Sequence, residues 1–356
     1  FKQKTAYEML RSLVGSEMCI RDRHITGVSM PRYWKRNGKR ELRIIVRNDC
    51  YRIDDEYLYL PKGLRLKYKG DLKWKGKKGR LEIIYDEVDK VWRGFMIVKV
   101  EKPQLKGGKK SLYMDLGVVN LATIWFEGLK KPIAFSGRAV LADWWYWKGR
   151  IAEEQSRLAR INRAKTSKRL MKLYRIRRRR FRHALNAMIK RIVEDAHQLG
   201  ISKIVLGRLR GIRGNSHNGK ANAMVNNFWS FNYTVRRFRE KCEEYGIKVE
   251  EGSEYKTSSE CPFCHSKGKR KYRGLFYCGK CGMAMNADAV GALNMARNDG
   301  TIIPNPSWGR DNWVVAHPLL LRWNGMRWEP KRAMNNQPMN TLRSKNLPTS
   351  SRGECQ

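Results

Sequence analysis

Two Cys-x-x-Cys pairs stand close together in the chain, Cys261 with Cys264 and Cys278 with Cys281, and 13 residues separate the pairs. Four thiolates at this spacing, each pair on a tight turn, are typical of a structural zinc ion with tetrahedral protein ligands. Four unrelated reduced cysteines or a redox dithiol are the alternatives, but a dithiol needs only one pair. We therefore predict that residues 257–285 form a zinc ribbon with these four cysteines as ligands.

Two aspartates could do chemistry beside this ribbon. Asp115 stands inside the apolar run SLYMDLG, and Asp288 follows the ribbon in the sequence Asn286-Ala287-Asp288, where a short helix is predicted to begin. A carboxylate within an apolar strand is costly to bury unless a cation lies beside it. Asp115 is therefore a candidate site residue, and a turn aspartate at a strand end is the alternative.

The composition indicates nucleic acid as the partner. Lys and Arg number 75 against 33 Asp and Glu among 356 residues, a formal net charge of +42. So large a charge opposes compaction unless a polyanion neutralises it. No apolar run reaches the ~18 residues of a membrane span, so no membrane partner is expected. The remaining cysteines are scattered, which favours a reducing compartment over a disulfide framework.

Residues 24–105 are predicted to form a small, basic all-β domain, either a barrel or a sandwich. Short runs such as ELRIIVRN, YLYLPKG and RLEIIYDE alternate apolar and polar residues, and turn-forming residues separate them. Their Lys and Arg residues could follow a phosphate backbone, although solvated strand faces account for much of this charge. Residues 1–23 resemble translated adapter read-through; we expect a non-native leader and exclude them from the fold.

A long helical region is predicted over residues 148–199. Apolar residues recur on one face of its second half, at Ala184, Met188, Ile192 and Ala196. The same segment contains a dense cationic block, for which a solvated helix face is the alternative interpretation. Because almost no acidic residue interrupts the block, we predict that it binds nucleic acid through Arg175, Arg177, Arg178, Arg179, Arg180 and Arg182.

The order of elements after residue 105 is that of a ribonuclease H-like α/β fold. Residues 106–256 are predicted to form a strand, turn, strand and strand, then helices, a strand, a helix and a strand; residues 286–300 form the last helix. Asp115 would lie on the first, central strand, with Asp288 beside it. Paired carboxylates in such a site hold two Mg²⁺ ions. Residues 301–356 lack periodicity and are predicted to be a loosely ordered tail, docked through isolated tryptophans.

Several segments together resemble the transposon-encoded TnpB proteins, RNA-guided nucleases related to the eukaryotic Fanzor proteins and to compact type V CRISPR effectors. The matching pieces are MDLGVVNLAT, RFRHALNAMIKRIVEDA, EYKTSSECPFC, YCGKCG and MNADAVGALNMARN, and the resemblance covers about residues 35–300. It implies an RNase H-like (RuvC) nuclease domain after a wedge-like β-barrel domain, cleaving DNA with two Mg²⁺ ions. The implied partners are a guide RNA and a double-stranded DNA target. The protein would be a cytoplasmic, nucleoid-associated monomer or weak dimer, encoded by an insertion-sequence-type element.

The chain departs from the family pattern at the middle carboxylate. Gly207 stands where the family usually has a glutamate, after the strand KIVLGRL. Some Fanzor-like and TnpB branches carry this glutamate on the neighbouring strand in an E-x-x-T-S context, which Glu254 matches here. The ends of adjacent parallel strands lie about 4.8 Å apart, so a relocated carboxylate can reach the same metal. Glu250 and Glu251 are the competing candidates.

Three hypotheses follow. The first is an active endonuclease whose catalytic, magnesium-binding residues are Asp115, Glu254 and Asp288. The second is a nuclease-dead, RNA-guided DNA-binding repressor, because Gly207 has no carboxylate. The third is a zinc-ribbon nucleic-acid-binding protein without a guide. Fewer residues precede Asp115 than in the family, so we expect part of the wedge domain and its helical insertion to be missing from this sequence.

Overall fold

The structure is a computed structural model that describes residues 42–72, 74, 76–101, 103, 110–129, 131–162, 166–207, 223–253, 255–272, 274–303 and 318–331. The chain divides into two compact units, up to and after Val100. The expected leader over residues 1–23 lies outside the described residues.

The first unit contains two small antiparallel sheets that share an apolar core. The strand orders are β1-β5-β6 and β2-β3-β4, and the buried core side chains are Val46, Leu58, Leu81 and Ile83. Among the described strands, no pairing joins the two sheets into a closed barrel, so of the two predicted arrangements, barrel or sandwich, the barrel is not confirmed. The elements are β1 (Arg43–Val46), β2 (Arg52–Ile53), β3 (Tyr57–Tyr59), the 3₁₀ turn η1 (Pro61–Gly63), β4 (Arg65–Lys67), β5 (Lys77–Asp86) and β6 (Val91–Lys99).

The second unit is built on a mixed sheet with the order β11-β10-β7-β8-β9-β15-β16. β7, β8 and β9 form an antiparallel meander, and β10 and β11 continue parallel to β7 on its other side. The predicted strands and the mixed α/β fold are therefore confirmed, with β7 in the interior of the sheet. The strands are β7 (Lys110–Asp115), β8 (Asn120–Phe126), β9 (Ile133–Ser136), β10 (Ile201–Gly207), β11 (Lys248–Gly252), β15 (Leu319–Trp323) and β16 (Trp328–Pro330).

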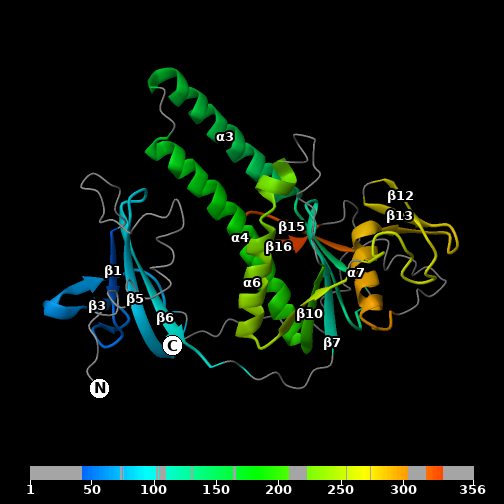
Figure 1. The fold of residues 1–356 in the computed structure, drawn as a ribbon, viewed down its shortest axis with the longest axis horizontal. Helices are drawn as coiled ribbons and strands as arrows, with labels where there is room; N and C mark the ends of the chain where they lie inside the picture. Colours follow the sequence, from blue (N-terminus) through cyan, green and yellow to red (C-terminus); the bar gives the residue numbers. More distant parts are fainter. Residues whose placement is uncertain are drawn as a thin grey trace, which may run out of the picture. The chain divides into compact units, whose positions relative to one another are not determined.

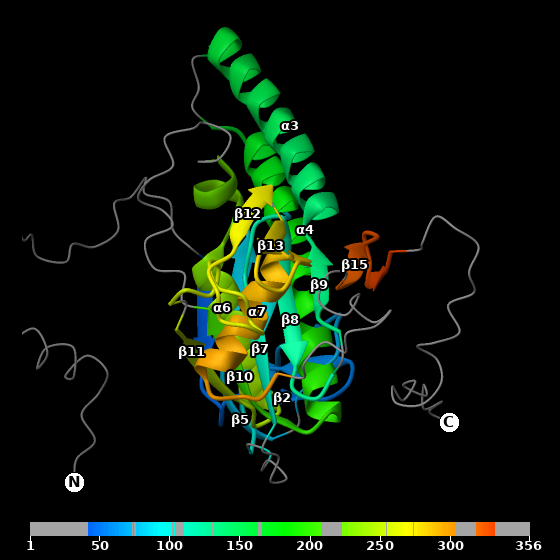
Figure 2. The same cartoon turned by 90° about the vertical axis from the view of Figure 1, so that its right-hand side faces the viewer.

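Helices cover both faces of this sheet (Figures 1 and 2). α4 and α6 pack on one face, whereas α7 lies on the other face and is covered by the small sheet β12-β13-β14. α3 and α4 form a long hairpin whose tip extends beyond the sheet (Figure 1). The remaining elements are α3 (Arg138–Asn162), α4 (Lys168–Gln198), the π-helical turn η2 (Ala223–Phe228), α6 (Phe231–Glu244), β12 (Lys269–Tyr272), β13 (Leu275–Cys278), β14 (Met283–Asn286) and α7 (Ala287–Asn298).

The predicted helical region is two helices, and its ends have clear causes. Ser167 caps α4 by accepting a hydrogen bond from the backbone N–H of Leu170 at 3.0 Å, and Gly200 follows the helix in a left-handed conformation with φ of +69°. The predicted apolar stripe of α4 is confirmed, because its four members are fully buried. α3 begins at Arg138, ten residues before the predicted start. Among the described helices, none is both long and apolar enough to cross a bilayer.

The expectation of a loosely ordered tail is wrong for residues 318–331. β15 pairs in parallel with β9, and β16 returns antiparallel beside it, so this segment extends the main sheet. Trp328 is 4% exposed, and its indole N–H donates to the Ala184 carbonyl at 3.0 Å. The apolar sequence LLLRW gains backbone pairing and burial on the edge strand β9, which the isolated segment could not provide. The rest of the tail after residue 303 lies outside the described residues.

Candidate functional site

Three parallel strands end at one edge of the sheet. Asp115 is the last residue of β7, Gly207 the last of β10 and Gly252 the last of β11. Met114 pairs with Leu206, and the two glycines pair with each other, so the end residues lie in one row across the sheet. Within this row of strand ends, Asp115 is the residue with a carboxylate.

Helix α7 brings a second carboxylate to this edge. Asn286 caps the helix: its Oδ1 accepts from the backbone N–H groups of Asp288 at 3.1 Å and Ala289 at 3.0 Å. The cap places Asp288 in the first turn, where the helix dipole favours negative charge. One turn later, a Cβ added at Gly291 would lie 2.8 Å from Asp115 Oδ2. α7 therefore lies directly against the Asp115 carboxylate and brings the two aspartates together.

The third predicted residue, Glu254, lies outside the described residues. Both of its competitors are engaged in ion pairs. Glu250 Oε1 lies 2.6 Å from Lys248 Nζ, and Glu251 Oε1 lies 2.8 Å from Arg239 NH2. The hydrogen bond from Lys248 lowers the pKa of Glu250.

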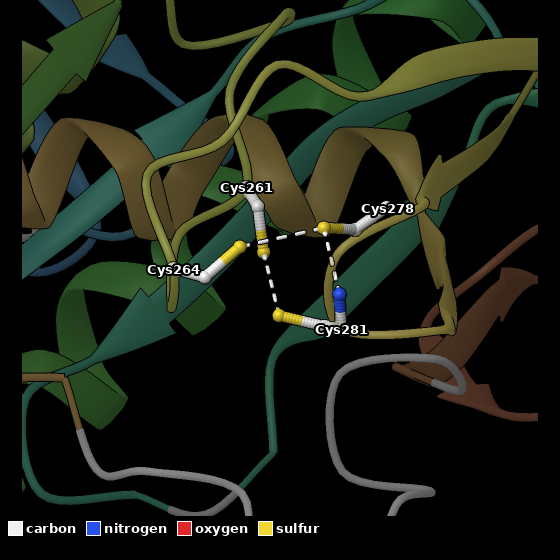
Figure 3. A group of neighbouring side chains, drawn as sticks. All are labelled: Cys261, Cys264, Cys278 and Cys281. Atoms are coloured by element: carbon white, nitrogen blue, oxygen red, sulfur yellow. Dashed lines mark hydrogen bonds between the residues drawn. The ribbon is translucent and has the colours of Figure 1, made fainter.

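The four cysteines converge in one cluster (Figure 3). Their sulfur atoms all lie within 4.8 Å of one another, with 3.9 Å between Cys261 Sγ and Cys281 Sγ and 3.4 Å between Cys264 Sγ and Cys278 Sγ. Tetrahedral zinc with Zn–S bonds of ~2.3 Å requires about 3.8 Å between sulfurs, so the cluster fits this metal. Within the described part of the chain, no other group of three or more His, Cys, Asp or Glu ligands converges in this way.

Both cysteine pairs occupy tight turns. In the first turn the His265 N–H donates to the Cys261 carbonyl at 3.1 Å, and in the second the Cys281 N–H donates to Cys278 Sγ at 3.4 Å. The residue after each pair is left-handed, with φ of +59° at His265 and +65° at Gly282. Burial raises the pKa of the Cys261 thiol, so its thiolate form needs a nearby cation, which zinc would supply.

The same helix that carries Asp288 holds the first cysteine turn. Asn294 of α7 is fully buried, and its Nδ2 donates to the carbonyl oxygens of Thr257 and Glu260, both at 2.8 Å. Arg297 donates to Glu260 Oε2 at 2.8 Å and to the Cys261 carbonyl at 3.2 Å. α7 is thus the common support of the carboxylate edge and the ribbon.

A network that sequence analysis did not identify joins the C-terminal end of α7 to the sheet. Asp299 Oδ2 accepts from the Tyr113 hydroxyl at 2.7 Å and from Lys203 Nζ at 2.6 Å. The bond with Asp299 raises the pKa of Lys203, and burial raises the pKa of Tyr113. The one available signal was the two-residue spacing between Tyr113 and Asp115, which places both side chains on one sheet face.

Several of the six predicted nucleic-acid-binding arginines contact the protein itself. The Arg177 guanidinium lies 5.1 Å from the Trp144 ring centroid, and burial lowers its pKa. Arg180 Nε donates to both carboxylate oxygens of Asp143, at 3.0 and 2.9 Å. Arg182 lies over an α6 tyrosine ring, 4.5 Å from its centroid. The other three side chains are half-buried or exposed: Arg175, Arg178 and Arg179.

A second cationic surface lies on the first unit, on the sheet β2-β3-β4. Tyr57 and Tyr59 alternate with the buried Leu58 and therefore share one face. On this face Arg65 lies 3.6 Å from the Tyr57 ring centroid, and Arg52 lies 4.6 Å from that of Tyr59. The alternation YLY was the sequence signal for such a face, but only strand pairing brings the cations beside the rings.

Two regions of the chain match known protein families. Residues 95–213 match the family described as a probable transposase, OrfB of IS605, and residues 231–295 match the Cas12f1-like TNB domain. The first match contains Asp115 at the end of β7, and the second contains the cysteine cluster and Asp288.

Similar proteins cover different shares of the chain. It is 29% identical over 325 residues to a TnpB-like protein of Acidianus two-tailed virus, covering 83% of this chain and 70% of that protein. A TnpB-like protein of Aquifex aeolicus (strain VF5) is 29% identical over 114 residues, 30% of this chain and 36% of that one.

Among solved structures, the Cas12f1–sgRNA–target DNA complex has a TM-score of 0.41 and 16% identity, over 60% of this chain and 55% of that one. The chain thus spans about half of the solved protein, and a likeness of this size does not establish a shared fold. The two family matches and the viral relative, of which the chain covers 70%, make the chain similar to TnpB-like proteins and to the IS605 OrfB transposase family.

Proposed function

We propose that the protein is an RNA-guided DNA endonuclease that cleaves phosphodiester bonds in an RNase H-like (RuvC) site. The observation that carries this proposal is the meeting of two carboxylates from distant parts of the chain, Asp115 on β7 and Asp288 on α7, at one edge of the sheet. The antiparallel meander with two further parallel strands beside β7 supports the RNase H-like assignment.

The donor set fits magnesium. Mg²⁺ prefers hard oxygen ligands and binds through one or two carboxylates together with phosphate oxygens. Asp115 and Asp288 would hold it here, with Glu254 as the third ligand. When bound, two such ions supply Lewis acidity to the attacking water and the leaving oxygen. The chain's own part is to hold the carboxylates in place, which the Asn286 cap at the N-terminus of α7 does for Asp288.

The position of Glu254 supports its assignment as the relocated middle carboxylate. It follows Gly252, the last residue of β11, by two positions, and β11 is the second strand from β7 at the same edge. The next residue, Tyr255, is tied to α7, because Asn298 Nδ2 donates to its carbonyl at 3.1 Å. Helix α7, which carries Asp288, therefore contacts Tyr255, the residue that follows Glu254 in the sequence.

Guide RNA and target DNA would bind through the cationic surfaces. The chain carries a formal net charge of +42, and the Tyr57/Tyr59 face presents aromatic rings interleaved with cations, which suits single-stranded RNA. Sequence specificity would come from pairing between guide and target, while the protein contacts backbone and shape. The zinc ribbon would be structural, since four thiolates leave no open coordination position.

Cleavage of a guide-matched DNA duplex by the purified ribonucleoprotein, with and without Mg²⁺, tests the proposal. Glu254→Gln should reduce cleavage by at least about a hundredfold while RNA and target binding stay unchanged, because the amide keeps the shape but not the charge. Glu250→Gln is the matched control and should retain activity, since Glu250 pairs with Lys248. Full cleavage by Glu254→Gln would disprove the relocation.

The alternative of a nuclease-dead, RNA-guided repressor is favoured by one observation, the missing side chain at Gly207 beside Asp115. It predicts guide-dependent target binding by the unmutated protein and no cleavage at any Mg²⁺ concentration. A protein that purifies without RNA and binds DNA regardless of sequence would instead be a guide-free zinc-ribbon protein.

A further inference from the structure

The start of β8 departs from regular strand alternation. Trp125 pairs with Tyr113 and Thr123 with Asp115, so these side chains share the sheet face that α7 covers. Regular alternation would place Leu121 next on this face. Leu121 is instead buried in the core on the α4 side of the sheet, and the β8–β9 register shifts between residues 120 and 122.

This irregularity directs Asn120 to the α7 side. Its Nδ2 donates to Asp288 Oδ2 at 2.8 Å. β-Bulges commonly re-aim a side chain beside an active site. The preceding turn is equally constrained, because a Cβ at Gly117 would lie 2.8 Å from the Asn120 carbonyl oxygen. A neutral amide donor holds one carboxylate oxygen without competing with a cation for the other.

Thr123 stands beside the other carboxylate. It is directly opposite Asp115 across the β7–β8 pair, and its side chain is 1% exposed. Its Oγ1 has no hydrogen-bond partner among the described residues. A buried hydroxyl without a hydrogen-bond partner is unfavourable. We therefore expect the Thr123 hydroxyl to form a hydrogen bond once water or a ligand enters the site.

We infer that β8 positions the metal-binding carboxylates: Asn120 orients Asp288, and Thr123 supplies a hydroxyl beside Asp115 for the hydrated, metal-loaded site. The inference rests on the proposed nuclease function, since it assigns roles around the same two aspartates. Asn120 and Thr123 are positioning residues and need not touch the substrate. Outer partners of metal ligands typically contribute about 10- to 100-fold in metal affinity or activity.

The first test measures Mn²⁺ binding to the nucleic-acid-free protein by electron paramagnetic resonance. Asp288→Ala should remove a site, and both Asn120→Ala and Asn120→Leu should weaken it by about 10- to 100-fold. Leu keeps the branched shape of Asn but cannot donate. Asn324→Ala is the control, because Asn324 lies in the β15–β16 turn and accepts only local backbone N–H groups at 2.9 and 2.8 Å. Zinc content and the thermal midpoint verify folding of each variant.

The second test uses Thr123→Val, which is nearly isosteric. Removing a buried, unpartnered hydroxyl should leave the thermal midpoint unchanged or raise it, whereas the Mg²⁺ concentration for half-maximal cleavage should rise several-fold. If Thr123 were merely structural, Thr123→Val would change neither the Mg²⁺ concentration for half-maximal cleavage nor the Mn²⁺ affinity.

The outcomes distinguish failure of the positioning inference from failure of the nuclease proposal. Loss of Mn²⁺ affinity in the Asn120 variants of a protein that never cleaves DNA would sustain the positioning inference and refute the nuclease proposal. Cleavage by the unmutated protein with undiminished Mn²⁺ binding and Mg²⁺ dependence in Asn120→Leu would overturn the inference for Asn120. Unchanged metal dependence in Thr123→Val would overturn it for Thr123.

Discussion

At the scale of single residues, the site depends on close approach. A Cβ at Gly291 would lie 2.8 Å from Asp115 Oδ2, whereas the same addition at Gly149 of α3 meets nothing within 4 Å. Glycine in a helix interior normally costs about 0.5–1 kcal/mol relative to alanine. The missing side chain at Gly291 therefore leaves the space that the Asp115 carboxylate occupies.

Gly291→Ala should lower both cleavage and stability, because the methyl group displaces either α7 or Asp115. If the proposed nuclease site is correct, we expect at least about a tenfold loss of cleavage rate, since a misplacement of about 1 Å can cost about a hundredfold. Gly149→Ala should be neutral or stabilising by about 0.5–1 kcal/mol. Single-turnover cleavage and urea unfolding of both variants provide the comparison; equal behaviour of the two would show that α7 tolerates a side chain there.

The Lys203–Asp299–Tyr113 network predicts sensitivity to alkaline pH. The pKa values of Lys203 and Tyr113 are both raised in the folded protein, by the Asp299 bond and by burial respectively. A raised folded-state pKa contributes stability that is complete below the unfolded value and is lost as pH rises through the folded one. The relevant window therefore begins near pH 10, the ordinary value for both groups.

Lys203→Met should lower the free energy of unfolding by about 1 kcal/mol at pH 7. The difference from the unmutated protein should shrink as pH rises above about 10.5, because the lysine then loses its charge. Urea midpoints at pH 7, 9 and 11 check this. Lys248→Met is the control, since the Lys248 side chain is 73% exposed and a surface pair contributes little. A gap that stays constant with pH would rule out the charged pair as its cause.

At the scale of elements, α7 lies between the main sheet and the cysteine-containing sheet β12-β13-β14 and packs against both. Its cap and Asp288 face the sheet edge, while Asn294 and Arg297 hold the first cysteine turn. Tyr113 and Val205 from the sheet and Phe276 from β13 belong to one apolar cluster around this helix. Disorder in the ribbon should therefore spread to the carboxylate edge.

Cys278→Ser should release about one equivalent of zinc, because structural zinc contributes folding free energy directly. Hydrogen exchange in residues 286–299 should accelerate markedly, whereas exchange in α4 should change little. Elemental analysis and exchange mass spectrometry measure both effects. Cys50→Ser is the matched control, as Cys50 is exposed in the first unit. Native protein without zinc, or unaltered exchange in α7 after zinc loss, would contradict this role for the ribbon.

At the scale of the whole molecule, the net charge of +42 makes affinity for nucleic acid strongly dependent on salt. The arginines of α4 do not all serve this purpose. Arg180 donates a hydrogen bond to Asp143, and this bond raises the pKa of Arg180. Arg178, on the same helix, is exposed. The total number of Lys and Arg side chains therefore overstates how many of them can contact phosphates.

Arg178→Gln should reduce the slope of log affinity against log salt by about 0.7 for single-stranded RNA, one phosphate's contribution, without altering stability. Arg180→Gln should mainly lower the thermal midpoint, because it breaks the bidentate pair between α3 and α4. Binding titrations between 50 and 300 mM salt and thermal unfolding distinguish the two. A slope unaffected by Arg178→Gln would assign that side chain to a merely solvated face.

The sequence by itself determined the cluster of four cysteines, the order of strands and helices, and the apolar stripe of α4. These follow from local spacing: two residues between cysteines, alternation along strands, and a three-to-four-residue repeat on a helix. The strands around Asp115 and the short helix after Asn286 lie at the positions that the residue spacing predicted. The barrel predicted as one of two arrangements of the first unit is not confirmed, and the loosely ordered tail is wrong for residues 318–331, because strand closure and edge pairing depend on partners distant in the chain.

Only the tertiary structure decided which side chains from distant parts of the chain lie near one another. Asp115 and Asp288 are far apart in sequence, and their meeting depends on α7 docking between sheet and ribbon through Gly291, Asn294 and Arg297. The hydrogen bond from Asn120 to Asp288 results from a register shift that no alternation pattern encodes. Such contacts arise from packing between elements, whereas sequence periodicity reports only how each element presents its own faces.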